Sequence, residues 1–427
     1  MSDVPAKGPI AYISHYLPAL TQTFVYREIL ALEKAGWKVH PFSLRRPTKG
    51  ISEEAKELAG RTFYLLPPRW ALFLLRQVQL FAAHPLKYCR ILLGLVLGRG
   101  DTLRARVHGL THFFGAMYVV PEMRRAGVRH VHAHFGQNPA TIALAAAEYL
   151  GIPFSMTIHA RDLFVDTHLL RTKLARARFV VTISEYNRRI LEEIAPRPSD
   201  TEKIHVLHCG IDLRRFPERE PESAAPASDA RPATFFAVGR LVEKKGYVYL
   251  VEAARLLKER GVSFVIRIIG GGPDRDSLAE RIAALGVGDC VRLEGSMPQE
   301  SLLPLLRQAD AFVLPCVLAR DGDQDGIPVS LMEAMAYGIP CVSTTISGIP
   351  ELIEDGREGI LVPEKDPAAI AGALERLARS PGLRRELGRA GRAKVERGFT
   401  LEGLAEALGS LYQKSMVSVP PAGAATK

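Results

Sequence analysis

The sequence is poor in cysteine, and its few cysteines are widely spaced. Five cysteines occur among 427 residues, and none of them forms a CxxC pair. This pattern argues against a disulfide framework and a zinc knuckle, and it fits a reducing compartment. The first residues, MSDVPAKGPI, lack a basic start followed by a long apolar core. We therefore expect no export signal and a cytoplasmic location.

Acidic residues are scarce in the region 66–127, where two of them stand against nine lysines and arginines. The uncharged apolar runs of this region, such as ILLGLVLG from Ile91, are far shorter than the about 20 residues that span a bilayer. The composition predicts a basic amphipathic surface that contacts an anionic membrane peripherally, on the inner face of the plasma membrane. A basic helix surface over a buried apolar stripe explains the pattern equally well.

A length of 427 residues predicts two domains, and 47% hydrophobic with 24% charged residues excludes disorder of the whole chain. The net charge is +10, but no aromatic-basic recognition motif accompanies it. We expect no nucleic-acid partner.

Short apolar runs alternate with helical patterns along most of the chain. The runs include PIAYIS, HVHAHF and PFSMTIH in the first half, and ATFFAVG, SFVIRIIGGG and AFVLP in the second. Strands separated by helices of ten or more residues predict parallel βαβ units. We therefore predict an α/β protein with two Rossmann-like, doubly wound domains, whose strand carboxyl ends face a central cleft.

A stretch rich in Pro, Ala, Ser and charge, PEREPESAAPASDARP, predicts a linker at 217–232. It separates expected domains at 1–216 and 233–395. A closing helix at 396–415 follows the completed second sheet, and we expect it to pack back on the first domain. The tail 416–427 is expected to be loose.

The loop GRLVEKKG, from Gly239, follows a predicted strand and precedes a predicted helix. Arg240 and Lys245 would then lie near a helix N-terminus, where two cations and unpaired N–H groups bind a diphosphate without a metal. A solvated charged loop is the alternative. After the next strand, Gly271 stands in a glycine triplet that permits close approach of a ligand, although a turn explains it equally well. The G-x-G-x-x-G spacing of a dinucleotide site is missing, which argues against a nicotinamide oxidoreductase.

The segment DGIPVSLMEAMAYGIPCVST, from Asp325 to Thr344, combines an acidic loop, a short apolar helix and a strand. The backbone amides of the loop Gly326, Ile327, Pro328 and Val329, at the helix N-terminus, can hold a sugar and a diphosphate, and Asp325 before them is assigned to the sugar hydroxyls. Glu333 is surrounded by apolar residues, so its carboxylate needs a partner, and a ribose diol would supply two hydrogen bonds. A surface glutamate is the alternative.

This segment resembles the E-x7-E signature of family 4 of the retaining, GT-B-fold glycosyltransferases, with Asp325 standing where the family has Glu. The motifs GRLVEKKG, GGGP and SGIPEL resemble further landmarks of that family in the usual order. The opening loop from His15, HYLPALTQTF, is similar to the members that assemble exopolysaccharides and colanic-acid-like polymers. Thr21, Gln22 and Thr23 replace a Ser-Glu-Thr run there.

The resemblance implies transfer of a hexose from a nucleotide-diphosphate sugar to a glycan acceptor, with retention of anomeric configuration and without a metal or another cofactor. The basic region 66–127 suggests a lipid-linked acceptor. Five residues are implied in catalysis, namely His159, Arg240, Lys245, Asp325 and Glu333. The acceptor side is implied to use Thr21, Gln22, Thr23, His134, Arg161 and Asp162.

Three histidines, His130, His132 and His134, alternate in HVHAHF and would face one side of a strand. A metal site is the sharper interpretation, but two neighbouring strand positions do not complete a tetrahedral shell, and no acidic residue is evidently close. We therefore expect no metal. A non-catalytic nucleotide-sugar sensor remains an alternative to an enzyme, and turnover would separate the two.

Overall fold

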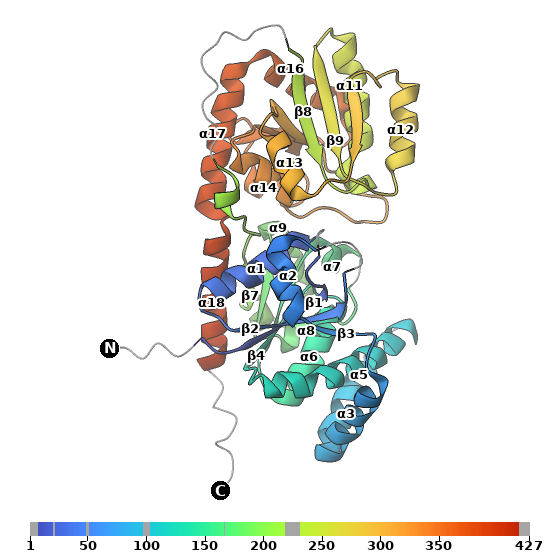
Figure 1. Cartoon of the computed structure of the whole chain (residues 1–427), viewed down its shortest axis with the longest axis vertical. Coiled ribbons are helices and arrows are strands. Elements are labelled where there is room, and N and C mark those ends of the chain that lie inside the picture. Colours follow the sequence, from blue (N-terminus) through green and yellow to red (C-terminus); the bar gives the residue numbers. More distant parts are fainter. Residues whose placement is uncertain are drawn as a thin grey trace, which may run out of the picture. The chain divides into compact units, whose positions relative to one another are not determined.

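The computed structural model describes residues 7–19, 22–47, 51–96, 103–165, 167–217 and 231–417, without the side chains of 103–106. The chain divides into two compact units (Figure 1). The first unit comprises residues 1–210 and 401–427, and the second comprises 211–400. Each unit contains one parallel sheet with helices packed against it.

The first unit has seven parallel strands in the order β3-β2-β1-β4-β5-β6-β7. Its strands are β1 (Ile10–Tyr16), β2 (Val39–Arg45), β3 (Phe63–Leu66), β4 (His130–His134), β5 (Phe154–Ile158), β6 (Phe179–Thr182) and β7 (Ile204–Val206). Its helices are α1 (Thr23–Lys34), η2 (Glu53–Ala55), α2 (Lys56–Arg61), α3 (Trp70–Ala83), α4 (Pro85–Val96), α5 (Leu103–Arg125), α6 (Asn138–Leu150), α7 (Ala160–Phe164), α8 (Leu170–Arg176), α9 (Glu185–Ile194), α10 (Pro198–Thr201) and α18 (Leu401–Val417).

The second unit has six parallel strands in the order β10-β9-β8-β11-β12-β13. Its strands are β8 (Ala233–Val238), β9 (Phe264–Ile269), β10 (Val291–Gly295), β11 (Ala311–Leu314), β12 (Cys341–Thr344) and β13 (Gly359–Val362). Its helices are η3 (Leu213–Arg215), η4 (Glu243–Lys245), α11 (Tyr247–Glu259), α12 (Arg275–Ala284), α13 (Gln299–Leu306), α14 (Val329–Ala336), α15 (Ile349–Leu352), α16 (Pro367–Arg379) and α17 (Pro381–Gly398).

Both sheets reverse their strand order beside the first strand of the unit, between β1 and β4 and between β8 and β11. The two doubly wound, Rossmann-like domains expected from the sequence are therefore confirmed. In such sheets ligands bind beyond the carboxyl ends of the strands, at the point of reversal. We therefore expect ligand-binding residues in the loops after β4, β5, β8 and β11.

The alternating side chains of β1 explain why helices cover both faces of the first sheet. Ala11 and Ile13 join an apolar core formed with α5 and α6, while Ile10 and Tyr12 join a core formed with α1 and α18. In α18, red in Figure 1, Tyr412 packs against the ring of Trp37 at 5.6 Å between centroids. The closing helix thus belongs to the first unit.

Three boundaries differ from those expected. The first unit ends at residue 210 because Ile211 pairs with Thr400, and the buried ring of Phe216 packs 5.0 Å from that of Tyr337. The break before the closing helix falls between residues 400 and 401. Met416, expected in a loose tail, lies in α18 and is buried in the core beneath it. Residues 218–230 of the expected linker and 418–427 of the tail lie outside the described residues.

Candidate functional site

In the second unit, the loop after β8 positions Lys245 directly before α11. The short helix η4 ends at Lys245, and the φ of 66° at the following residue, Gly246, is left-handed. A Cβ there would come within 1.9 Å of the carbonyl oxygen of Pro315, so only glycine fits this close approach of two loops. Tyr247 then begins a helix of 13 residues. A lysine at such a helix N-terminus provides a favourable place for an anion.

Lys245 and Asp325, which the sequence assigned to different parts of the donor, form an ion pair. Nζ of Lys245 lies 2.8 Å from Oδ2 of Asp325, and Nζ of Lys244 lies 3.6 Å from its Oδ1. Burial alone would raise the pKa of Asp325, but the ammonium groups of Lys245 and Lys244 outweigh burial and hold that pKa below its usual value. Burial is the largest single influence on the pKa of Lys245 and lowers it, but Asp325, through its charge and its hydrogen bond, together with the neighbouring Cys316 and Asp323, outweighs burial and raises that pKa above its usual value. Both groups are therefore charged at neutral pH.

Two further side chains, which sequence reasoning missed, surround this pair. The thiol of Cys316, just after β11, donates to Oδ2 of Asp325 at 3.4 Å. The hydroxyl of Tyr247 is buried and has no hydrogen-bond partner within the described ranges. A Cβ added to Gly239 would lie 2.8 Å from that hydroxyl. A buried unpaired hydroxyl costs stability, so one that borders a candidate site suggests a ligand that completes it.

Glu333 projects from α14, where residues Leu331 to Ala336 are all buried. The glutamate itself is 8% exposed, which excludes the surface interpretation. Nε2 of Gln299, at the start of α13, donates to Oε1 of Glu333 at 2.7 Å. Gln299 is the nearby partner that a buried carboxylate requires, and its distance along the chain hid it from sequence analysis.

The remaining residues predicted to bind the donor lie in the same loops. Gly326, Ile327 and Pro328 are buried in the turn that enters α14 at Val329, while Arg240 is exposed. A Cβ on Gly271 would lie 2.6 Å from Oγ of Ser296, which explains this glycine by packing of the loops.

In the first unit, His134 and His159 stand at the carboxyl ends of β4 and β5 and lie next to each other. Their Nε2 atoms are 2.8 Å apart. Nδ1 of His134 lies 2.6 Å from the hydroxyl oxygen of Tyr12, and that hydroxyl donates to the carboxylate of Glu28 in α1. The chain of hydrogen bonds thus runs from Glu28 through Tyr12 and His134 to His159.

This chain places one proton of His134. Tyr12 donates to Glu28, so its oxygen accepts from Nδ1–H of His134, and one proton lies between the Nε2 atoms of His134 and His159. Burial first, and His134 second, lower the pKa of His159 well below its usual value, which keeps His159 neutral. Burial and Glu28 raise the pKa of Tyr12. His159 is therefore a neutral, oriented imidazole.

Asp162, predicted on the acceptor side, forms hydrogen bonds to the loops after β4 and β5. Its Oδ2 accepts from the backbone N–H of His159 and of Gly136, each at 2.9 Å. Burial raises the pKa of Asp162 to about 6, although these backbone hydrogen bonds oppose the rise. Arg161 beside it is exposed.

The opening loop is described only in part, and Thr21 lies outside the described residues. Gln22 precedes α1, and its Oε1 is buried without a hydrogen-bond partner in the described part of the chain. Thr23 begins α1. After β4, Phe135 adopts a φ of 82°, a strained value for a residue other than glycine, and strain of this kind concentrates at functional sites.

Glu28, His132 and His134 form the one group among the described residues with three metal-ligating atoms within 4.8 Å of one another. A carboxylate does therefore lie beside the alternating histidines, contrary to expectation, because α1 packs against this face. However, Nδ1 and Nε2 of His132 bond to Ser155 and Thr157 at 2.8 and 3.1 Å, and both nitrogens of His134 are engaged as well. Hydrogen bonds account for all four nitrogens, and the absence of a metal stays a prediction.

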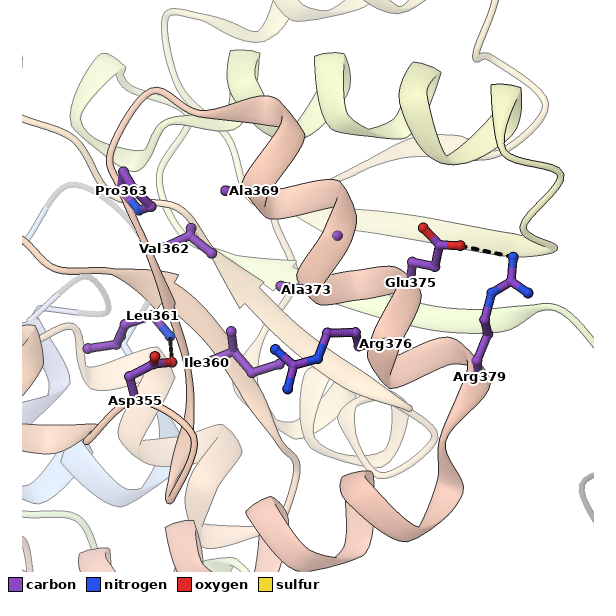
Figure 2. A pocket seen from close by; sticks show the side chains of 11 residues that line it. Asp355, Ile360, Leu361, Val362, Pro363, Ala369, Ala373, Glu375, Arg376 and Arg379 are labelled. Atoms are coloured by element: carbon purple, nitrogen blue, oxygen red, sulfur yellow. Dashed lines mark hydrogen bonds and ion pairs between the residues drawn. The ribbon is translucent and has the colours of Figure 1, made fainter.

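A pocket of about 640 Å³ lies between β13 and α16 (Figure 2). Oδ1 of Asp355 accepts from the backbone N–H of Leu361 on one side, and Glu375 pairs with Arg379 on the other. None of the residues predicted for the donor site lines it.

Comparison with known proteins matches both halves of the chain to families. Residues 21–215 match Glycosyltransferase Family 4, and residues 218–394 match Glycosyl transferases group 1. A Salmonella typhimurium protein assigned as the colanic acid biosynthesis glycosyltransferase WcaL is 37% identical over 292 residues, which cover 66% of this chain and 69% of that protein. The amylovoran biosynthesis glycosyltransferase AmsK of Erwinia amylovora is 43% identical over 198 residues, 46% of this chain and 47% of AmsK.

Among solved structures, Anabaena HepE in complex with UDP aligns with a TM-score of 0.69. The alignment covers 95% of this chain and 100% of HepE, at 14% sequence identity. At that identity the likeness concerns the fold alone.

Proposed function

The chain belongs to the family 4 glycosyltransferases, and we propose that it moves a hexose from a nucleotide-diphosphate sugar to a lipid-linked glycan acceptor, with retention of anomeric configuration. The proposed product is an intermediate of an exopolysaccharide or another surface polysaccharide. The named roles of WcaL and AmsK in colanic acid and amylovoran biosynthesis support that choice. The nicotinamide oxidoreductase and the sensor are set aside, because these relatives are glycosyltransferases.

The single observation that carries the donor assignment is the position of Glu333. Glu333 is 8% exposed, on a helix with apolar neighbours and next to the switch point of the sheet, and its carboxylate accepts a hydrogen bond from Gln299 at 2.7 Å. A carboxylate has the capacity to accept several hydrogen bonds, and the two hydroxyls of a ribose would donate to it. The UDP named in the HepE structure supports a nucleotide ligand of this fold.

Lys245 is proposed to bind the diphosphate. Its ammonium group, at the N-terminus of α11, is held by Asp325 at 2.8 Å until phosphate oxygens arrive. Arg240, which is exposed at the end of β8, is proposed as the second cation. As the anomeric C–O bond breaks, negative charge grows on the leaving phosphate, and fixed cations stabilise that charge most. Asp325 and the turn from Gly326 to Val329 would contact the sugar hydroxyls.

Retention is proposed to occur by attack on the face that the leaving group vacates. The acceptor hydroxyl forms the new bond to the anomeric carbon, and the departing phosphate takes its proton. This route needs no enzyme nucleophile and no metal. His159 contributes a neutral imidazole oriented by His134, which suits hydrogen bonding to a sugar or phosphate. Gln22, whose amide oxygen is buried without a partner among the described residues, is proposed on the acceptor side.

The enzyme is proposed to work at the cytoplasmic face of the membrane, where a lipid-linked acceptor is reached from the surface. In the described part of the chain, no helix combines the length and apolar character needed to cross a bilayer.

A thermal-shift screen tests the donor assignment. UDP-, GDP-, ADP- and dTDP-sugars are offered to the wild type and to Glu333→Gln, and one donor class should raise the melting temperature of the wild type. Glu333→Gln should lose most of that shift, while Glu300→Gln on the neighbouring α13 should keep it. Equal shifts for both variants would contradict the role given to Glu333. Transfer from that donor to a membrane extract then measures turnover.

A further inference from the structure

One face of α3 is apolar and exposed. Trp70 is 67%, Leu74 60% and Val78 66% exposed, and Phe81 is 47% exposed. At 100° per residue these four side chains fall within an arc of about 80°. Leu75, 51% exposed, widens the same face. Large apolar side chains that gather on one helix face mark an interaction surface, whereas scattered ones do not.

The side of α3 that carries Arg76 is fixed to α5, and Gln77, at the edge of the apolar face, is bound to α5 as well. Nη1 of Arg76 donates to the carbonyl oxygen of Tyr118 at 2.7 Å, and its guanidinium pairs with Glu122. Nε2 of Gln77 donates to the carbonyl oxygen of Phe114 at 3.2 Å. Figure 1 shows α3 beside α5 at the margin of this unit. The exposed face is therefore held outward, and Arg76, although part of the basic region, is not available to a partner.

Helix α4 also exposes large apolar side chains. Leu86, at its start, is 87% exposed, and Leu93 is 51% exposed. Arg90 is exposed and Lys87 half-buried, while α3 and α4 contain no acidic residue. Arg69, just before α3, is exposed as well. Apolar side chains edged only by cations are complementary to an anionic lipid surface, which offers hydrocarbon behind negative headgroups.

We propose that the exposed faces of α3 and α4, with Trp70, Leu74, Val78, Phe81 and Leu86 as the inserted side chains, hold the enzyme in the interface of an anionic bilayer. We call these five residues the lipid face. The proposal builds on the proposed membrane location and states which residues provide it. Cations at its edge contact headgroups, and the apolar side chains enter the acyl boundary.

The topology connects the lipid face to the first unit's histidines. β3 ends at Leu66, and α3 begins four residues later, at Trp70. All strands of this sheet are parallel, so β3 ends at the same edge as β4 and β5, where His134 and His159 lie. A bilayer at the start of α3 would present a lipid-linked acceptor at the edge where these histidines stand.

Cosedimentation with vesicles tests the proposal without any sugar substrate. The probes are vesicles of phosphatidylcholine alone and of phosphatidylcholine with phosphatidylglycerol. The wild type should bind the anionic vesicles, and the double variant Leu74→Asp with Val78→Asp should bind them at least about tenfold more weakly. Ile51→Asp, which changes an exposed apolar residue of the same unit outside α3 and α4, is the matched control and should bind like the wild type. Arg90→Glu should weaken binding to anionic vesicles only.

Tryptophan fluorescence gives a second readout that needs no folded double variant. The chain has two tryptophans, and Trp37 is 4% exposed while Trp70 is 67% exposed. Anionic vesicles should shift the emission to shorter wavelength, brominated lipid should quench it, and Trp70→Phe should abolish both effects. Vesicle binding that is absent, or unchanged in the double variant, would overturn the proposal. So would self-association through this face, seen as a dimer that the double variant dissolves.

The donor-induced thermal shift of the wild type separates this proposal from the proposed function. The double variant should retain that shift, because it changes nothing in the second unit. A wild type that binds vesicles but no nucleotide-sugar would leave the lipid face in place and remove the proposed donor.

Discussion

The two units share one topology but differ in the groups at their strand ends. All twelve histidines of the chain lie in the first unit, and the second unit has none. The first unit arranges neutral imidazoles on a hydrogen-bonded chain, whereas the second arranges lysines on carboxylates. Lysine and aspartate keep their charges across the physiological pH range, which suits a diphosphate. Neutral imidazoles suit hydroxyl groups. The same scaffold is thus suited to two kinds of ligand.

Removing a cation from the second unit should have the largest effect. We expect Lys245→Ala to lower kcat by about a hundredfold to a thousandfold, because growing charge on the leaving diphosphate loses its fixed partner. His159→Ala in the first unit should lower kcat by a smaller factor, since this change removes one hydrogen bond to an uncharged group. Initial transfer rates at saturating donor measure both, with the exposed Lys365→Ala as control. A larger loss in His159→Ala would reverse the comparison.

Neutralising Asp325 should reduce stability. Asp325→Asn leaves the ammonium of Lys245, 12% exposed, without its charged partner. We expect the free energy of unfolding at pH 7 to fall by about 3 kcal/mol, as when one member of a buried pair is removed. Urea denaturation followed by circular dichroism measures it.

Asp325→Glu keeps the charge and restores the acid of the resembled signature, so it should retain or raise activity. Total loss of activity would mean that the loop is built around aspartate. Equal stability of Asp325→Asn and the wild type would show that the ion pair contributes nothing.

Acid should destabilise the first unit selectively. Burial lowers the pKa of His130 to about 3, and His132 and His159 shift in the same direction. The folded pKa lies below the unfolded value of 6.5, so the stability from each neutral histidine is present above pH 6.5 and is lost as pH falls toward 3. Between pH 6.5 and 5, His130 alone should account for a loss of about 2 kcal/mol.

Both tryptophans lie in the first unit, so their emission during urea unfolding follows that unit alone. His130→Gln should flatten the pH dependence, whereas the exposed His84→Gln should leave it unchanged. A wild type whose first unit is equally stable at pH 7 and pH 5 would contradict the role given to these histidines.

The smallest effect should come from removing the hydroxyl of Tyr247, which has no hydrogen-bond partner among the described residues. If the donor completes the hydrogen bonding of Tyr247, Tyr247→Phe should weaken donor binding by about fivefold, the worth of one hydrogen bond of about 1 kcal/mol. Without donor, the variant should be as stable as the wild type or slightly more so, because a buried unpaired group is removed. Calorimetric titration measures the Kd. An unchanged Kd would leave the hydroxyl without a ligand role.

The sequence was sufficient to predict the two parallel sheets, because each strand and helix has its own local pattern of apolar residues. It was also sufficient for the burial of Glu333, whose neighbours in the helix are apolar. The sequence could not predict which side chains interact with the buried site residues. Gln299 lies 34 residues from Glu333, and Glu28 lies more than 100 residues from His134, so only the packing of helices on the sheet brings them together. The ion pair of Lys245 with Asp325 was hidden for the same reason.

The end of the first domain was predicted at residue 216 instead of 210 for a related reason. Residues 211–216 look like the end of the first domain in the sequence, since no strand pattern follows until Ala233. Their attachment is decided by the burial of Phe216 against Tyr337 in the second unit. Side chains that pack on a distant segment carry no local signal.

The return of the chain at Leu401 has a consequence for biosynthesis. Tyr412 and Leu408 of α18 complete the core above Tyr12, and the hydroxyl of Ser415 lies 2.9 Å from Nδ1 of His130. A ribosome delivers residues 211–400 before this helix, so the second unit has all of its residues while the first still exposes an apolar face. The first unit begins earlier yet is completed later, and the hydrogen bond between His130 and Ser415 forms only after translation has passed all of the second unit.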